Sequence, residues 1–358
     1  MPLARNKAFF LCYYGSQYGC NPKYLSQYIT KIQPTWDIIW GFTQPERHKI
    51  SGIRKVRYLS LRFFYELCTS QVVVANYRMP LFYHRRRGQL YIQTWHSSMR
   101  LKAIEADAVT SLSKNYLDMA YNDSQQISIL LSGCKKSSDI FKSAFWYNGI
   151  ISPTGTPRLD ILMASNQKLS NEIKNRLAIK NCSHIVLYAP TFREYSNTDV
   201  YDIDLLKLKK SFKQRWGGEW QVLVRLHPHM LGKHLKGALN EVVDVTAYDD
   251  IQELLLISDV VVTDYSSLMF DFAVTKRPCF LYVPDLDEYL KRERQLYFSL
   301  DSLPFPKIRS NMQIDDVIYH FDEDKYSEDV DAFLQQTGSY ETGNACENVF
   351  QIIQQYTQ

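Results

Sequence analysis

Two histidines that follow predicted strands are the side chains best suited to proton transfer in this chain. His96 follows the strand predicted at 89–94, and His227 follows the strand predicted at 221–226. Imidazole titrates near neutral pH, so it can accept the proton of a reacting hydroxyl group. We therefore interpret His96 as a candidate general base, with a half-buried histidine bonded only to backbone as the structural alternative. His227 lies two residues after Arg225, in a basic environment that suits an anionic leaving group.

A polar turn between a strand and a helix predicts a phosphate site. The β-branched run 260–262 reads as a buried strand, and apolar residues recur at helical spacing from Leu268. Between them lie Asp264, Ser266 and Ser267. A helix start offers unpaired N–H groups and the positive end of a dipole, to which serine hydroxyls add donors. An ordinary serine N-cap is the structural alternative.

A third cluster contains an arginine just beyond a strand end. Thr191 and Arg193 follow the strand predicted at 185–190. The fork of a guanidinium group suits phosphate, although an ion pair with Glu194 would explain Arg193 equally well. Ligands of open α/β sheets bind beyond the carboxyl ends of the strands. The four polar clusters therefore predict a ligand cleft; they are 94–98, 191–194, 225–229 and 263–267.

Strands that alternate with helices indicate parallel sheets joined by crossovers. The predicted strands are 7–14, 37–40, 71–76, 89–94, 127–132, 185–190, 221–226, 242–245, 260–262 and 278–283. They fall into two sets around a polar, helical linker at 162–182, so we predict domains 1–165 and 166–358. A closing helix at 347–356 can pack on either domain.

Charge is unevenly distributed along the chain. The net charge of the 358 residues is only +4, but the cationic excess lies mostly before Lys102. Basic residues cluster at 47–57 and 84–87, which suits a polyanionic acceptor or an anionic membrane surface and does not by itself suggest a nucleic-acid binder. The segment 53–67 interleaves cations with apolar residues at roughly helical spacing.

Several classes of protein are disfavoured by absent patterns. Seven cysteines without a CxxC pair predict reduced core thiols instead of a disulfide framework or a zinc site. The sequence has no signal-peptide pattern and no apolar run near the roughly 20 residues that span a bilayer. It also lacks HExxH and Walker motifs, and we expect neither a bound metal nor a cofactor.

The motifs and their order resemble the CDP-glycerol glycerophosphotransferases, which include teichoic acid primases and polymerases and capsule-polymer relatives. The resemblance covers residues 9 to about 298. The matching segments are NPKYL (21–25), DIIW (37–40), NYRMP (76–80), YIQTWHSS (91–98), SDIFKSAF (138–145), TGTPRLDIL (154–162), LYAPTFRE (187–194), LVRLHP (223–228) and the long motif 250–289. The chain departs from the family at Ser97, Ser98 and Met99, where Gly-Thr-Pro is usual, which affects the local backbone and acceptor choice.

The resemblance implies an α/β, GT-B-like fold, with two Rossmann-type doubly wound domains facing a central cleft. It implies transfer of glycerol phosphate, or another polyol phosphate, from a CDP-polyol to an acceptor hydroxyl, with release of CMP. His96 would be the base and His227 would contact the donor phosphates. The expected donor-binding residues are Thr191, Arg193, Arg225, Asp264, Ser266 and Ser267, and those expected on the acceptor side are Arg78, Trp95, Ser97 and Ser98.

The family acts at the cytoplasmic face of the bacterial membrane on lipid-linked or polysaccharide acceptors. This gives a role to the basic stretches 47–66 and 84–87, which are expected to lie on anionic lipid as a peripheral anchor, with Phe63, Phe64 and Tyr65 entering the interface. A core helix with a solvated basic face is the alternative for 47–66.

Three other functions remain open from the sequence. A CDP-ribitol-dependent transferase would use the same residues. A GT-B nucleotide-sugar glycosyltransferase would share the fold but usually release a nucleoside diphosphate. A non-catalytic polymer-binding subunit would have no need of His96 and His227.

Overall fold

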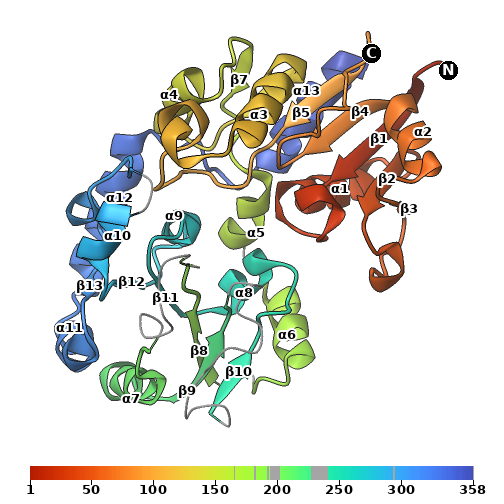
Figure 1. Ribbon diagram of the computed structural model, residues 1–358. Coiled ribbons are helices and arrows are strands. Elements are labelled where there is room, and N and C mark those ends of the chain that lie inside the picture. The colour runs from red at the N-terminus through yellow and green to blue at the C-terminus, as the bar shows by residue number, and fades with distance from the viewer. Residues whose placement is uncertain are drawn as a thin grey trace. The chain divides into compact units, whose positions relative to one another are not determined.

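The computed structural model describes residues 1–164, 166–180, 183–191, 193, 202–226, 241–292 and 295–357. The chain forms two compact α/β units, each with its own parallel sheet (Figure 1). Unit 1 comprises Met1–Met99, Ile104–Ala164 and Thr337–Gln358, and unit 2 comprises Arg100–Ala103 and Ser165–Gln336. The predicted domains, 1–165 and 166–358, did not anticipate that residues 100–103 belong to unit 2. The closing helix, for which packing on either domain was left open, belongs to unit 1.

The sheet of unit 1 has seven parallel strands in the order β3-β2-β1-β4-β5-β6-β7. The strands are β1 (Ala4–Leu11), β2 (Asp37–Phe42), β3 (Arg54–Arg57), β4 (Ser70–Ala75), β5 (Leu90–Gln93), β6 (Ile129–Leu131) and β7 (Ile150–Ser152). Helices cover both faces of such a sheet, so its inner strands are apolar on both sides. Phe9 and Phe10 accordingly point to opposite faces and are both fully buried. The order reverses between β1 and β4, which makes that position the topological switch point of the sheet.

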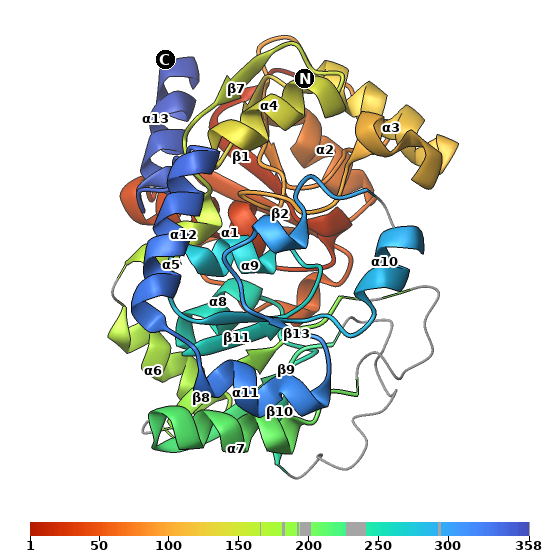
Figure 2. The same cartoon turned by 90° about the vertical axis from the view of Figure 1, so that its left-hand side faces the viewer.

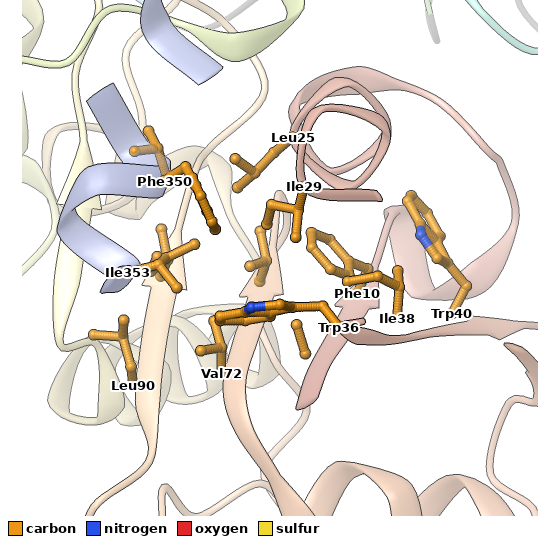
Figure 3. Packing of buried hydrophobic residues seen from close by; sticks show 14 of the residues in the cluster. Phe10, Leu25, Ile29, Trp36, Ile38, Trp40, Val72, Leu90, Phe350 and Ile353 are labelled. Carbon is orange, nitrogen blue, oxygen red and sulfur yellow. The ribbon is translucent and has the colours of Figure 1, made fainter. Parts of the chain in front are cut away.

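The last helix of the chain completes the core of unit 1. The helices of this unit are α1 (Cys20–Ile32), α2 (Leu61–Thr69), α3 (Lys114–Gln126), α4 (Lys135–Ala144), α5 (Asp160–Met163) and α13 (Ala345–Thr357). Figure 3 shows Phe350 and Ile353 of α13 facing Leu25 and Ile29 of α1 across the same cluster as Trp36. The rings of Phe350 and Trp36 are 5.9 Å apart. Residues more than 300 positions apart in the sequence therefore share one hydrophobic core.

The sheet of unit 2 has the order β10-β9-β8-β11-β12-β13 and reverses between β8 and β11. Its strands are β8 (Ser183–Tyr188), β9 (Glu219–Val224), β10 (Val242–Asp244), β11 (Val260–Thr263), β12 (Cys279–Tyr282) and β13 (Lys307–Ile308). Its helices are α6 (Gln167–Arg176), α7 (Leu205–Trp216), α8 (Ile251–Ile257), α9 (Leu268–Ala273), α10 (Leu286–Arg292), α11 (Ile314–Tyr319) and α12 (Glu323–Thr337). Figure 2 shows α7 beside α11, where Ser211 donates a hydrogen bond to Asp315.

The helix suggested for 53–67 is wrong in its first half. Residues Arg54–Arg57 form β3 at the edge of the sheet, and α2 begins only at Leu61, where Ser60 caps it. Phe63 is also not available to a membrane: it is fully buried and its ring contacts Phe9 at 5.2 Å. Phe64 and Tyr65, by contrast, are exposed.

Other expectations from the sequence need smaller corrections. No disulfide joins the described cysteines, but Cys68 is exposed and so is not a core thiol, while Cys182 lies outside the described residues. Strands β3, β7 and β13 were not predicted. Within the described residues, no helix has both the length and the apolar character needed to cross a bilayer.

Candidate functional site

His96 lies just beyond the end of β5, in a turn that holds its ring at a defined orientation. Trp95 adopts a left-handed φ of +51°, and the His96 ring stacks on the indole with centroids 4.3 Å apart. The Nδ1 atom of His96 lies 3.2 Å from the carbonyl oxygen of Asn76, which follows β4. In the tautomer that donates this hydrogen bond from Nδ1, Nε2 is the nitrogen that can accept a proton. The ring is half-buried, and its role as a general base remains a prediction.

Asn21, in the first turn of α1, holds the backbone on which His96 is mounted. Its amide nitrogen donates to the carbonyl oxygens of Thr94 and Trp95, at 3.1 and 2.9 Å. Its oxygen accepts a hydrogen bond from the backbone N–H of Arg158 at 3.1 Å. Asn21 is completely buried, so each of these bonds replaces one that water cannot make. One side chain thus connects the His96 turn to the TGTPR segment.

The residues predicted on the acceptor side surround the His96 turn, but they are buried. Trp95, Ser97, Ser98 and Arg78 are between 1% and 8% exposed. Arg78 donates to both carboxylate oxygens of Glu105, at 2.8 and 2.5 Å, and to Asp123 at 3.1 Å. Burial raises the pKa of Asp123 above its ordinary value, because the opposing effect of the Arg78 charge is smaller. These contacts indicate that the buried residues support the His96 turn. Direct contact of any of these four residues with an acceptor remains a prediction.

The unusual Ser97-Ser98 pair is fixed by the start of α4. The carbonyl oxygen of Ser98 accepts a hydrogen bond from the Ser137 hydroxyl at 2.6 Å. A Cβ atom added to Gly133 would lie only 2.8 Å from the Cβ of Ser98, so a glycine is needed at this close approach. The turn after His96 is therefore tightly packed without the Gly-Thr-Pro sequence that the resemblance led us to expect.

In unit 2, Thr191 and Asp264 lie at the switch point between β8 and β11. The carboxylate of Asp264 accepts hydrogen bonds from the Thr191 backbone N–H, at 2.9 and 3.0 Å, and from its hydroxyl at 2.5 Å. Ligands of doubly wound sheets bind at such positions. The structure thus brings together two of the predicted donor-binding residues.

Arg193 is enclosed by two carboxylates and two tyrosine rings. Its guanidinium donates to Asp264 at 2.7 Å and to Asp285 at 2.6 and 3.2 Å, and it lies over the rings of Tyr265 and Tyr289. Burial lowers the pKa of Arg193, but the two carboxylates outweigh this effect and raise it, so the group stays charged. Its side chain is only 1% exposed. The predicted role of Arg193 as a phosphate ligand is untested, and its visible role is to hold the loops after β8, β11 and β12 together.

The remaining donor-side candidates are more accessible. Ser266 and Ser267 are half-buried at the start of α9, and the hydroxyl oxygen of Ser266 accepts a hydrogen bond from the Leu268 N–H at 3.2 Å. Arg225 is half-buried just after β9. His227 lies outside the described residues, so its predicted contact with donor phosphates cannot be placed. Among the described residues there is no group of three or more histidine, cysteine or acidic side chains arranged to hold a metal ion.

Comparison with known proteins decides the family. A family model described as CDP-Glycerol:Poly(glycerophosphate) glycerophosphotransferase matches residues 1–355. The chain belongs to this family. The resemblance seen in the sequence motifs is therefore confirmed.

Members of the family include relatives that match most of this chain. A teichoic acid glycerol-phosphate transferase of Staphylococcus aureus is 31% identical over 98% of this chain and 93% of the relative. A teichoic acid poly(glycerol phosphate) polymerase of Staphylococcus epidermidis is 30% identical over 95% of this chain, which spans about half (49%) of that polymerase. A ribitol-phosphate primase of Bacillus spizizenii is less similar, at 28% identity over 82% of this chain.

A solved structure of the wall teichoic acid polymerase TagF matches the fold. The TM-score is 0.88 at 30% identity, and the match covers 99% of this chain and 90% of that chain. The α/β, GT-B-like class expected for this glycerophosphotransferase family member is thereby confirmed.

Sequence reasoning missed three parts of the site. Asp285 comes shortly after β12 and accepts hydrogen bonds from Arg193. Asn21 lies in the NPKYL motif and bonds to the backbone before His96. Tyr77 lies in the NYRMP motif, with its ring centroid 5.7 Å from that of His96. Asp285 and Tyr77 follow strand ends closely, so the rule that led to Arg193 and His96 also applied to them. Asn21 gave no such signal, because its role depends on backbone atoms more than 70 residues away.

Proposed function

We propose that this glycerophosphotransferase family member transfers glycerol phosphate from CDP-glycerol to a hydroxyl of a teichoic acid acceptor. The observation that carries the proposal is the mounting of His96, whose Nδ1 bonds to Asn76 and whose Nε2 can accept the acceptor's proton. Family membership and the glycerol phosphate named for its more similar relatives support the donor.

The reaction balances with the groups that this chain supplies. The acceptor oxygen gives its proton to His96 and forms a bond to the β-phosphorus of CDP-glycerol. The bond from that phosphorus to the bridging oxygen breaks, and CMP leaves with the electron pair. Positioning and neutralisation of charge dominate phosphoryl transfer. In this proposal Ser266, Ser267, Thr191 and Arg225 line the donor side, together with His227.

The test is release of CMP from CDP-glycerol, with CDP-ribitol and a UDP-sugar in parallel. A synthetic lipid-linked acceptor is present, with and without chelator. We expect CMP from CDP-glycerol in the wild type and a loss of about 100-fold or more in His96→Ala, since a general base contributes about 10²–10⁴-fold. His320→Ala is the matched control, because that side chain is 69% exposed just after α11.

Each alternative predicts a different outcome of the same assay. CMP from CDP-ribitol alone would identify a ribitolphosphotransferase. Turnover of the UDP-sugar alone would support the glycosyltransferase, and acceptor binding without turnover of any donor would support a polymer-binding subunit. Equal activity of His96→Ala and His320→Ala with CDP-glycerol would remove His96 as the base. Loss of activity with chelator would contradict the expectation that no metal is needed.

The proposal includes an anionic membrane surface and a lipid-linked acceptor. Apolar side chains are exposed on α2 and on a nearby loop, and the rings of Phe64 and Phe82 are 5.3 Å apart. The exposed apolar residues are Leu59, Leu61, Phe64, Tyr65, Leu81 and Phe82. The exposed cations of the same stretches include Arg57, Arg62, Arg85 and Arg87. Such a surface suits acyl chains under anionic headgroups.

Sedimentation with vesicles tests the membrane contact. We expect the wild type to sediment with vesicles that contain phosphatidylglycerol, and Leu61→Ser/Phe64→Ser to remain in solution. Tyr319→Ser is the control, since Tyr319 is 74% exposed in unit 2. Equal sedimentation of all three proteins would refute the contact.

A further inference from the structure

Three tyrosines gather beside His96 at the switch point of the unit 1 sheet. Tyr13 and Tyr14 follow β1, Tyr77 follows β4, and these two strands are where the strand order reverses. The Tyr77 ring lies 5.8 Å from Tyr13, 5.0 Å from Tyr14 and 5.7 Å from His96. The Tyr13 ring is also 5.8 Å from His96. The proposed base is thus one side chain of a four-ring cluster.

The tyrosines are held in place although they are only half-buried. Tyr13 and Tyr14 have left-handed φ values of +42° and +55°, which bulky residues rarely adopt. Such conformations persist where the surrounding structure imposes them. Here Gly15 packs directly on Gly41 and Phe42, so a Cβ at Gly15 would lie 3.0 Å from the Gly41 carbonyl oxygen. The turn therefore holds two adjacent, half-buried rings just beyond β1, where Tyr13 also packs against the edge of the core.

We propose that Tyr13, Tyr14 and Tyr77 form an acceptor subsite that binds the hydroxyl-bearing polyol phosphate end of the growing polymer. The proposal rests on the proposed function, in which His96 takes the proton of that hydroxyl. Open sheets bind ligands at the switch point, beyond the carboxyl ends of the strands. Tyrosine rings offer flat apolar faces for the C–H groups of a polyol and hydroxyl groups for its oxygens.

The chemistry of the cluster suits the polyol part of an acceptor better than a donor diphosphate. The three tyrosines contribute no positive charge, whereas diphosphate recognition usually relies on cationic donors. The Tyr14 hydroxyl is protonated at neutral pH, as tyrosine hydroxyls ordinarily are, and burial raises its pKa further. It donates to the Met119 sulfur at 3.7 Å, a weak acceptor that a polyol oxygen could replace. A neutral donor of this kind fits a polyol oxygen.

Binding of a synthetic oligomer of glycerol phosphate, measured by calorimetry without donor, tests the subsite. We expect Tyr77→Ala to weaken binding of the oligomer about tenfold, since it removes an aromatic contact surface. Tyr77→Phe keeps the ring and should bind within about threefold of wild type. Tyr319→Ala is the control, and CDP-glycerol binding is measured for all four proteins.

The outcomes separate this proposal from the proposed function. Weaker oligomer binding in Tyr77→Ala, with CDP-glycerol binding unchanged, supports the subsite even if no CMP is released in the transfer assay. Failure of the wild type to bind the oligomer would overturn it, as would unchanged binding in Tyr77→Ala or an equal loss of CDP-glycerol binding. If Tyr77→Ala does not fold, Tyr14→Ala replaces it, because Tyr14 belongs to the same cluster and its ring lies 5.0 Å from that of Tyr77.

Discussion

Two buried arginines, Arg78 and Arg193, are used in the same way in the two units. Each donates to two carboxylates and lies over aromatic rings, at 4.1 Å from the Phe145 centroid for Arg78 and 4.9 Å from Tyr265 for Arg193. A planar guanidinium with five donors can tie several loops together at fixed angles. Their visible contacts therefore hold the loops that carry the candidate site residues.

Asp285→Asn tests this role of Arg193. The substitution leaves the buried guanidinium with one charged partner instead of two, and removing a partner from a buried ion pair costs about 3–5 kcal/mol. We expect the free energy of unfolding of unit 2 to fall by that amount, as measured by hydrogen exchange at increasing urea concentrations. Asp287→Asn is the matched control, because Asp287 is exposed two residues away. Equal stability of the two variants would mean that Asp285 does not support Arg193.

Glu66 is expected to make unit 1 sensitive to acid. Burial alone would raise the pKa of Glu66, but hydrogen bonds from Arg54 and Lys7 lower it from 4.5 to about 2. Because the folded pKa is lower, the stabilisation is complete above pH 4.5 and disappears as the pH falls towards 2. The difference corresponds to about 3 kcal/mol.

Urea unfolding of unit 1 between pH 6 and pH 2 measures this contribution. We expect Glu66→Gln to lack this part of the pH dependence, whereas Glu46→Gln should keep it, because the Glu46 side chain is 61% exposed. A wild-type profile that is flat between pH 4.5 and 2 would contradict the prediction.

At the scale of elements, the first turn of α1 positions the end of β5. Asn21→Ala should leave the Thr94 carbonyl oxygen and the Arg158 N–H without the Asn21 partner, whereas the Trp95 carbonyl oxygen keeps its hydrogen bond from the Thr94 hydroxyl. Each unsatisfied group costs about 1–3 kcal/mol. A small displacement of a catalytic group can cost about 100-fold in rate. We therefore expect a lower kcat for CMP release, with the KM for donor unchanged.

The control for Asn21→Ala is Asn115→Ala, an exposed position on α3. A positioning role requires that kcat falls while the midpoint of the pH–rate profile stays in place, because His96 is still present. A rise in donor KM with unchanged kcat would instead place Asn21 in substrate binding.

The elements that the sequence predicted well are those whose pattern is local. The continuous apolar runs of β4 and β11 show burial on both faces, which a central parallel strand requires. By contrast, β3 reads RKVR and β13 has two residues, so neither carries a pattern of its own. For the site, strand ends predicted the positions of His96 and Arg193. The partners of Arg193 are 71 and 92 residues away, which no local spacing reveals.

At the scale of the molecule, unit 1 is assembled from three separate parts of the chain. Helix α13 belongs to it because Phe350 and Ile353 fill the core between α1 and the sheet. The carboxylate of Asp160 accepts hydrogen bonds from the first N–H groups of α13, those of Ala345 at 2.9 Å and Cys346 at 2.8 Å. The helix is thus an integral part of unit 1.

Phe350→Ala is expected to destabilise unit 1 selectively. Deleting a buried phenylalanine ring costs about 3–5 kcal/mol, since the cavity does not fully collapse. Hydrogen exchange should show faster exchange in β1, β2 and β4, with the strands of unit 2 unaffected. Gln355→Ala, exposed on the same helix, should behave like the wild type. An equal loss of protection in both units would show that they unfold as one.

The place of α13 also sets the order in which the protein can acquire its structure during translation. Strands β1 to β7 leave the ribosome before any part of the main body of unit 2. The hydrophobic surface around Leu25, Ile29 and Trp36, however, stays uncovered until residues 345–357 have been synthesised. Unit 2, whose strands lie within a single continuous segment, can form in that interval. We therefore expect nascent chains in which unit 2 is compact while unit 1 still exposes the hydrophobic surface that α13 later covers. Chaperones can bind this surface until α13 packs on it.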